Sequence, residues 1–184
     1  MRKAQVFKIY FCLTSTFILW SSDVISADWP DEGTTIYVTH FIVHPTSTID
    51  AGSTDKIVSL EMVGTTTNTD GGNLMDKLAA QCSAIQVISK DRTYIDGGCV
   101  LADKDGDKIF STFDTREITL TFEKNKPTSP IPKYTCGTHL IVNGTGKYKG
   151  MTGKEPFSCS VLPTVAAEGW SGMDIEHQLS YKFK

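Results

Sequence analysis

Four aspartates between residues 103 and 114 have a spacing that could bind a metal ion. They occupy positions 1, 3, 5 and 12 of a possible calcium loop: Asp103, Asp105, Asp107 and Asp114. Such a loop gathers oxygen ligands around a hard cation, but its sixth position needs glycine and its twelfth is usually glutamate. Here the sixth position is Lys108, and both flanks alternate like strands. The pattern favours a solvated hairpin turn without a metal, with a calcium site as the alternative.

A glycine-rich stretch at Gly144–Gly153 has a composition that could bind phosphate. A Walker loop, however, ends in Gly-Lys-Ser/Thr and leads into an apolar helix. In this chain Gly146 and Lys147 are followed by Tyr148, and the next apolar segment, 157–161, has the pattern of a strand. The stretch therefore predicts a tight connection between two strands whose glycines adopt positive φ, and we expect no cofactor.

Two histidines, His40 and His177, lie in phase with the apolar residues of their segments. In a closed barrel such side chains could meet in the interior, where burial shifts the pKa of an imidazole and equips it for acid–base chemistry. The competing interpretation is that each is a core residue with a satisfied hydrogen bond. No Gly-x-Ser-x-Gly elbow accompanies them, which argues against Ser-His-Asp catalysis.

In the segments that must position these side chains, apolar and polar residues alternate with period two, as they do in half-buried strands. In segment 35–44 the predicted inward face is Ile36, Val38, His40, Ile42 and His44. In segment 174–183 it is Ile175, His177, Leu179, Tyr181 and Phe183. Asn73–Ala80 is expected to form one or two helical turns, because Leu74 and Leu78 share a side. Short, regularly spaced strands with little helix predict a single all-β domain, an antiparallel eight-stranded closed barrel that leaves no exposed sheet edge.

Four cysteines are expected to form two disulfides: Cys82, Cys99, Cys136 and Cys159. Four cysteines allow three connectivities. Two strand-like segments flank a turn at Lys90-Asp91, and a hairpin with that turn places residue 82 opposite residue 99. We therefore favour a Cys82–Cys99 bridge, which leaves Cys136 to pair with Cys159 by elimination.

The first 27 residues have the features of a cleavable signal peptide. Arg2, Lys3 and Lys8 accompany an apolar run that ends at Trp20, too short to cross a bilayer core of about 30 Å, and Ala27 supplies a small residue for cleavage. The mature domain is then 28–184, and without the leader's three basic residues and one acidic residue it keeps 15 basic against 20 acidic residues. This net charge of −5 argues against nucleic acid and anionic membranes as partners. We expect a secreted or periplasmic domain, free of the membrane after cleavage, and predict no oligomeric state.

Three segments of this outline carry a resemblance to a known family. The segment Gly98–Phe110, the stretch Leu140–Gly153 and the final alternating strand resemble the allene oxide cyclase barrel-like family of secreted or periplasmic bacterial proteins. The resemblance covers residues 74–183, and its most specific part is Gly-Thr-Gly-Lys-Tyr-x-Gly-x-Thr-Gly. It implies an eight-stranded antiparallel barrel of calycin type with a lipophilic cavity. The plant cyclases that name the family fold a fatty-acid epoxide in such a cavity, but a shared barrel transfers no catalytic residue to this chain.

The leading functional hypothesis is an extracytoplasmic barrel that binds a small apolar, lipid-like molecule in its lumen without catalysis. The predicted lumen residues are Val38, His40, Ile42, His177, Leu179 and Tyr181. A mostly apolar wall with a few polar groups suits such a site. One alternative is an isomerase like allene oxide cyclase that acts on an oxidised lipid, and it requires a buried ionisable group beside the cavity. The other is a secreted interaction protein that binds no ligand.

Overall fold

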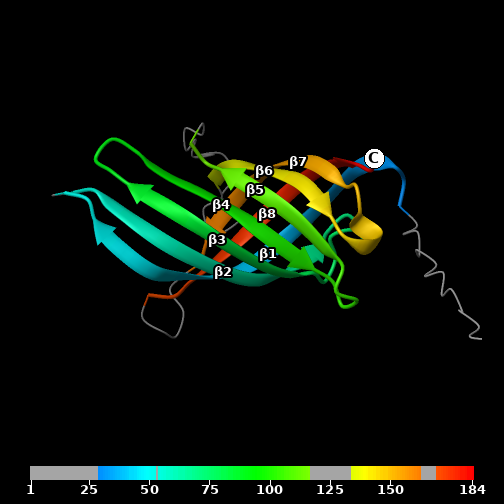
Figure 1. Cartoon of the computed structure of the whole chain (residues 1–184), viewed down its shortest axis with the longest axis horizontal. Coiled ribbons are helices and arrows are strands. Elements are labelled where there is room, and N and C mark those ends of the chain that lie inside the picture. The colour runs from blue at the N-terminus through cyan, green and yellow to red at the C-terminus, as the bar shows by residue number, and fades with distance from the viewer. Residues whose placement is uncertain (1–28, 53, 117–133, 163–168) are drawn as a thin grey trace, which may run out of the picture.

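Alternating side chains build strands that curl into a closed barrel (Figure 1). The computed structural model describes residues 29–52, 54–116, 134–162 and 169–184. The predicted signal peptide, residues 1–27, lies outside the described residues. The elements are β1 (Glu32–Asp50), β2 (Lys56–Asn68), β3 (Ala79–Ile88), β4 (Thr93–Ala102), β5 (Lys108–Asp114), β6 (Tyr134–Gly144), the 3-10 turn η1 (Gly146–Tyr148), β7 (Thr152–Val161) and β8 (Ser171–Lys182). No helix in the described part of the chain is long and apolar enough to cross a membrane.

Each strand pairs antiparallel with its neighbour in sequence, and β8 returns to pair with β1. The register shifts within three pairs: between Pro45 and Ser47 in β1, between Phe110 and Ser111 in β5, and in β6 just before Gly137. Such bulges bend a strand and increase its twist, which helps a sheet to close. The predicted fold, an antiparallel eight-stranded closed barrel, is confirmed.

One end of the barrel is filled by side chains from the chain termini and two connections. Trp29 stacks on Tyr148 of η1, with ring centroids 5.3 Å apart, and its indole N–H donates to Asn73 Oδ1 at 2.5 Å. In the β2–β3 connection Leu74, Met75 and Leu78 are buried. This end therefore forms the packed part of the core, and open space has to be sought elsewhere.

The predicted helical turns at Asn73–Ala80 are wrong. Met75 and Lys77 have φ values of 63° and 55°, in the left-handed region, so the backbone cannot continue as a helix. Leu74 and Leu78 share a side because both pack into the end of the barrel. The spacing of the two leucines indicated that they are buried together, but it did not indicate the backbone conformation between them.

Both predicted disulfides are present, Cys82–Cys99 and Cys136–Cys159. Cys82 lies directly opposite Cys99 in the β3–β4 pair, in the register that a turn at Lys90-Asp91 requires. The second bridge joins β6 to β7. Each bridge thus links two consecutive strands.

Candidate functional site

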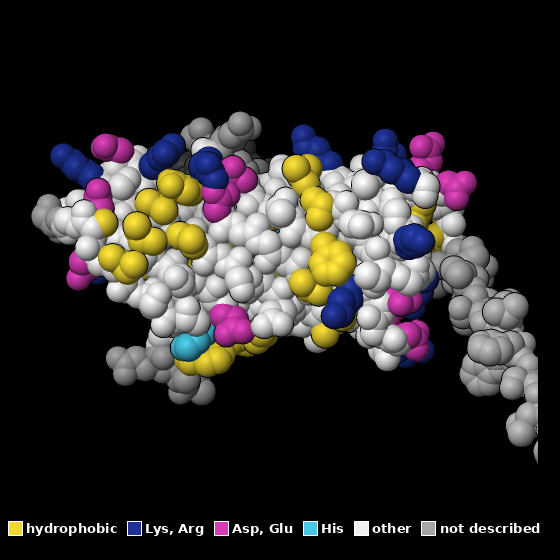
Figure 2. Space-filling model, viewed as in Figure 1, with side chains coloured by type: hydrophobic (Ala, Val, Ile, Leu, Met, Phe, Trp, Pro, Cys, Tyr) yellow, Lys and Arg dark blue, Asp and Glu magenta, His cyan; other side chains and the backbone are white. Residues whose placement is uncertain are grey.

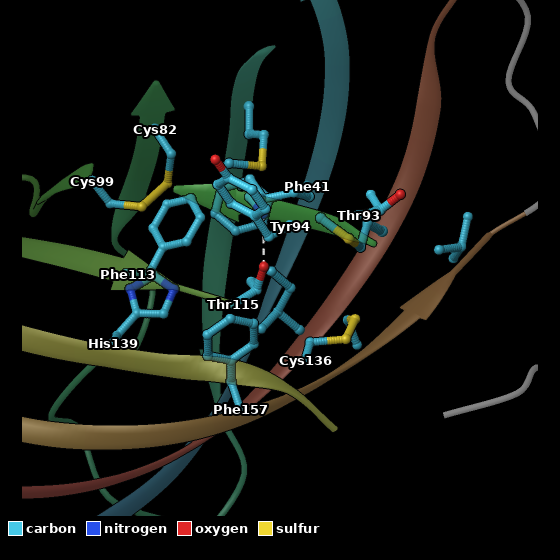
Figure 3. Close-up of a pocket in the computed structure, with 16 residues that line it drawn as sticks. Phe41, Cys82, Thr93, Tyr94, Cys99, Phe113, Thr115, Cys136, His139 and Phe157 are labelled. Carbon is cyan, nitrogen blue, oxygen red and sulfur yellow. Dashed lines mark hydrogen bonds between the residues drawn. A yellow bond between two sulfur atoms is a disulfide. The ribbon is translucent and has the colours of Figure 1, made fainter. Parts of the chain in front are cut away.

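An apolar cavity of about 210 Å³ lies toward the barrel end formed by the β3–β4 turn (Figure 3). Its wall is rich in aromatic rings and in sulfur, and all four disulfide cysteines contribute to it. The lining residues are Phe41, Met62, Cys82, Thr93, Tyr94, Ile95, Cys99, Phe113, Thr115, Cys136, His139, Phe157, Cys159, Val161, Met173 and Ile175. Rings and sulfur atoms make favourable contacts with flat apolar molecules. The cavity is thus suited to a small, mainly apolar ligand.

Two glycines in the strands make room for the rings that shape the wall. A Cβ at Gly97 would lie 2.8 Å from the ring of Phe113, and a Cβ at Gly137 would lie 2.5 Å from the ring of Phe157. Phe113 and Phe157 flank His139, with ring centroids 4.8 Å from the imidazole in both cases. The two glycines therefore leave room for the two rings that flank His139.

Gly137→Ala should lower the free energy of unfolding by about 1–3 kcal/mol, because the added methyl group overpacks the wall against Phe157. Urea unfolding of the variant measures this loss. Gly98→Ala is the matched control, since the nearest atom to its Cβ is Ser111 O at 3.2 Å. Equal losses in both variants would show that the ring contact does not matter.

Below the cavity a group of buried polar side chains spans four adjacent strands: Tyr37 of β1, His177 of β8, Glu155 of β7 and His139 of β6. Strand register explains their proximity. Tyr37 faces His177 across the β1–β8 pair, and His139 faces Glu155 across the β6–β7 pair. Their side chains all point inward because each strand buries alternate residues.

Glu155 is the centre of this group. Tyr37 Oη donates a hydrogen bond to Glu155 Oε2 at 2.7 Å. The other carboxyl oxygen, Oε1, lies 3.6 Å from His139 Nδ1 and 3.8 Å from His177 Nδ1. Within the described residues, Glu155 Oε1 and His177 Nδ1 are buried without a hydrogen-bond partner. Two unpartnered polar atoms that face each other in a dry interior are costly and call for a bridging group.

A small void of about 10 Å³ is lined by these same groups, together with Thr39, Phe41, Ala80, Cys99 and Leu101. That volume corresponds to about one water molecule, and a buried water needs two to four polar partners. Glu155 Oε1 and the Nδ1 atoms of His139 and His177 supply them. Phe41, Cys99 and His139 line both this void and the larger cavity, so these three side chains lie between the two spaces.

Burial fixes the protonation states of the group. Removal from water raises the pKa of Glu155 to about 8 against the lowering effect of the Tyr37 hydrogen bond, and it lowers the pKa of His139 to about 3. Burial, with a smaller effect of His139, holds the pKa of His177 well below its ordinary value. Burial and the nearby Glu155 raise the pKa of Tyr37. At neutral pH all four groups are therefore mainly uncharged, and the His–Glu contacts are not ion pairs.

Each histidine has a hydroxyl partner, which can donate to a bare ring nitrogen or accept from a protonated one. Ser111 Oγ lies 3.3 Å from His139 Nδ1, and Thr39 Oγ1 lies 3.1 Å from His177 Nε2. A protonated Glu155 Oε1 has one hydrogen to donate, so it can serve one of the two Nδ1 atoms at a time, directly or through a water molecule, and that imidazole then carries its own hydrogen on Nε2. When Glu155 is ionised, Oε1 is an acceptor instead and favours hydrogen on the Nδ1 that faces it.

Three of the six predicted lumen residues lie inside the barrel and three do not. His177, Leu179 and Tyr181 are buried on the inner face of β8. The placement of Val38, His40 and Ile42 in the lumen is wrong, because β1 turns Tyr37, Thr39 and Phe41 inward. His40 is 51% exposed, and its Nδ1 lies 2.9 Å from Asp174 Oδ1 on the outer wall. Of the six residues, His177 contributes to the small void and none lines the larger cavity.

The phase of β1 was misjudged because this barrel carries apolar residues on its outside as well. Figure 2 shows apolar side chains among charged ones on the surface. The exposed large ones are Ile36, Ile42, Ile49, Val63, Ile85, Val100, Leu140, Val142 and Val161. Since β-branched residues suit either face of a pleated strand, a row of Ile and Val does not identify the inner face.

The aspartate-rich segment forms a turn that a lysine neutralises. Asp103 Oδ1 accepts hydrogen bonds from the backbone N–H groups of Asp105 and Asp107, and Asp103 Oδ2 lies 2.5 Å from Lys147 Nζ. Asp114 belongs to β5 and pairs with Arg116. Across residues 29–52, 54–116, 134–162 and 169–184, no three His, Cys, Asp or Glu side chains could together hold a metal ion. The glycine-rich stretch supplies that lysine and includes η1, with Gly146 and Gly150 at positive φ.

Sequence reasoning missed Glu155, His139 and Tyr37. One signal was available for Glu155, which lies in phase with Phe157 and Cys159, so a carboxylate shares the face of a ring and a disulfide. A carboxylate on an apolar face is rare unless it has a function or a partner.

No family model and no curated protein matches the chain. Among solved structures, it is similar to the pterocarpan synthase dirigent protein GePTS1, with 12% identity, 86% of this chain and 90% of that chain covered, and a TM-score of 0.44. It is also similar to the pterocarpan synthase dirigent protein PsPTS1, with 13% identity, 85% and 99% covered, and the same TM-score of 0.44. The barrel assignment itself rests on the strand pairing of this chain.

Proposed function

We propose that this protein binds a small, mainly apolar molecule in the barrel cavity, with His139 as a polar contact. The observation that carries the proposal is the 210 Å³ cavity, whose wall of rings and sulfur atoms is interrupted by a neutral imidazole. A cavity of about 150 Å³ holds benzene. The ligand is therefore compact, of the size of one ring system with a short substituent, and shorter than a long-chain lipid.

We also propose that the protein works outside the cytoplasm and is a relative of the allene oxide cyclase barrel-like proteins. Two disulfides support the first point, because such bonds persist in oxidising compartments. An eight-stranded barrel with an apolar interior supports the second. The enzymatic alternative, an isomerase, has one specific observation in its favour, which is the buried ionisable group at Glu155 beside the cavity.

The methionines of the mature chain provide a test of ligand binding. Met62 and Met173 line the cavity, whereas Met75 and Met151 are completely buried without contributing to its wall. Adding indole, naphthalene or cyclohex-3-en-1-one to protein labelled at the methionine methyl carbons should shift the NMR signals of Met62 and Met173 and leave the other two in place. Four unmoved signals with every compound would overturn the proposal.

Ile95→Trp should weaken binding at least about tenfold, which corresponds to about 1.4 kcal/mol. Ile95 lines the cavity, so the larger ring occupies part of the space the ligand needs. The matched control is Ile85→Trp on the neighbouring strand, where the side chain is 51% exposed. Titration of the methionine signals with indole measures both dissociation constants. Equal affinities in the two variants would place the ligand elsewhere.

A further inference from the structure

We infer that His139 and Glu155 form a proton relay into the cavity, and that the barrel catalyses proton shifts in the molecule it binds. This inference rests on the proposed function, since the relay acts on a ligand in the same cavity. A suitable substrate class is a compact apolar ketone with a carbon–carbon double bond one position removed from conjugation, because its isomerisation needs only the removal of a proton from one carbon and its return to another, and the cavity is small and apolar. In this relay His139 is the catalytic residue, and Glu155 acts through it.

The geometry supplies each link of the relay. Phe41, Cys99 and His139 line both the cavity and the small void, and His139 is the titratable one of the three. Across the void, Glu155 Oε1 lies 3.6 Å from His139 Nδ1, a separation that one water molecule or a small side-chain movement can bridge. Glu155 Oε1 is buried without a hydrogen-bond partner among the described residues, as expected for an atom that exchanges its proton.

Tyr37 holds the carboxyl group in place for this exchange, and His177 lies beside it. The hydroxyl of Tyr37 donates to Glu155 Oε2, so the exchangeable proton is directed to Oε1. His177 approaches Oε1 from β8 at 3.8 Å and is itself fixed by Thr39. The titratable groups that face Glu155 are thus Tyr37, His139 and His177. The other residues around the void, including Cys99 in its disulfide, do not titrate.

The reaction step begins with Glu155 ionised and the hydrogen of His139 on Nδ1. The bare Nε2 of His139 removes a proton from the carbon between the carbonyl and the double bond, while the Nδ1 proton passes to Glu155 Oε1. The ligand is then a dienolate, His139 carries the substrate proton on Nε2, and Glu155 is protonated. The proton returns along the same path to the far carbon of the former double bond, which leaves a conjugated ketone and restores the ionised carboxylate. No oxidant, reductant or other reactant is consumed.

A pKa of about 8 at Glu155 suits this role, because a catalytic base works best when its pKa lies near the working pH. The rate should therefore rise with pH through about 8 and then level off. The histidines stay uncharged across that range, since burial holds the pKa of both well below the ordinary value. The rise thus belongs to one carboxyl group.

The test uses cyclohex-3-en-1-one, whose conversion to the conjugated ketone is followed by NMR from pH 6 to pH 10. Glu155→Gln should lose the rise with pH and about 100-fold of the rate at high pH, the typical share of acid–base catalysis. His139→Gln should lose a similar factor and provides a second variant if the first folds poorly. Glu61→Gln is the matched control, because the Glu61 carboxylate contacts Gln81 on the outer wall.

Binding is measured separately through the Met62 and Met173 signals, so the two proposals can fail independently. If the ketone shifts these signals but reacts no faster than in buffer, or if Glu155→Gln keeps the rate and its pH dependence, the relay is wrong and the binding proposal stands. If none of the three compounds shifts the signals, both proposals are wrong. Binding together with a carboxyl-dependent rate supports the relay.

Discussion

Glu155→Gln should gain about 4–5 kcal/mol of stability relative to the wild type when the pH is raised from 4.5 to above 8. The reason is that folding raises the pKa of Glu155 from 4.5 to about 8, and each pKa unit corresponds to about 1.4 kcal/mol. Between these two values the folded state holds a proton that the unfolded state releases. The free energy of unfolding of the wild type therefore falls as pH rises across this window. Glutamine has no such proton and escapes the loss.

The buried histidines produce the opposite slope at lower pH. The unfolded chain protonates them near pH 6.5, whereas burial keeps the pKa of His139 at about 3 and that of His177 well below 6.5. Stability from these two groups is complete above pH 6.5 and is lost as pH falls. Both variant and wild type share this effect, so it cancels in their difference. The wild type should be most stable near pH 6.5.

The measurement is urea unfolding of both proteins at several pH values, compared as the difference between them. Glu61→Gln again serves as the control, because it makes the same chemical change at a carboxylate whose partner, Gln81, lies on the outer wall. A Glu155→Gln difference that stays flat from pH 5 to pH 9 would mean that the carboxyl group titrates normally. The relay would then lose the support that it draws from the raised pKa of Glu155.

The same substitution is expected to improve the relative stability of the fold as the pH rises and to remove catalysis. A site that keeps an ionisable group in an apolar interior is strained electrostatically, and replacing that group commonly raises stability at the expense of function. A carboxyl group of purely structural value would give the same pH-dependent stability difference, because that difference follows from burial alone, but its replacement would leave the reaction rate unchanged. The two experiments on Glu155 together therefore distinguish a functional group from a structural one.

The β-strands were predictable from sequence where one face was clearly polar. In β8 the predicted inward residues His177, Leu179 and Tyr181 alternate with the polar residues Gln178 and Ser180. The structure buries the first three and exposes the other two. In β1 both faces carry apolar or aromatic residues. The alternation therefore predicted that this segment is a strand, but it could not predict which face of the strand points into the barrel. Tyr37, Thr39 and Phe41 point inward there, and His40 instead pairs with Asp174, which lies directly opposite on β8.

The cysteine pairing was predictable because a turn fixes the register of a hairpin, and Cys82 faces Cys99 as a result. The candidate site was not predictable in the same way. Tyr37, His139 and Glu155 are far apart in sequence and meet through closure of β1 on β8 and the register of β6 with β7. A search for charged residues in phase with apolar ones could have found Glu155, although its partners depend on the closed barrel.

Removing the Cys82–Cys99 bridge by a double substitution to alanine should lower the free energy of unfolding by about 3 kcal/mol. The bridge joins residues 17 apart in sequence, and closing a loop of that size restricts the unfolded chain by about this amount. The Cys136–Cys159 bridge spans 23 residues and should contribute about the same. Urea unfolding of each double variant measures these losses. A loss of unfolding free energy below about 1 kcal/mol in both double variants would show that the bridges contribute little and that packing stabilises the fold.

The location of the bridges explains why packing alone is not expected to suffice. All four cysteines line the 210 Å³ cavity, and Figure 3 shows the two bridges on different sides of it. Side chains around an unfilled cavity make fewer packing contacts than those in a filled core, so this end of the barrel gains less from packing than the end around Trp29. Two bridges of about 3 kcal/mol each compensate by restricting the unfolded chain. The quadruple alanine variant should therefore show roughly the sum of both losses, and it should unfold at the cavity end before the packed end around Trp29 and Tyr148.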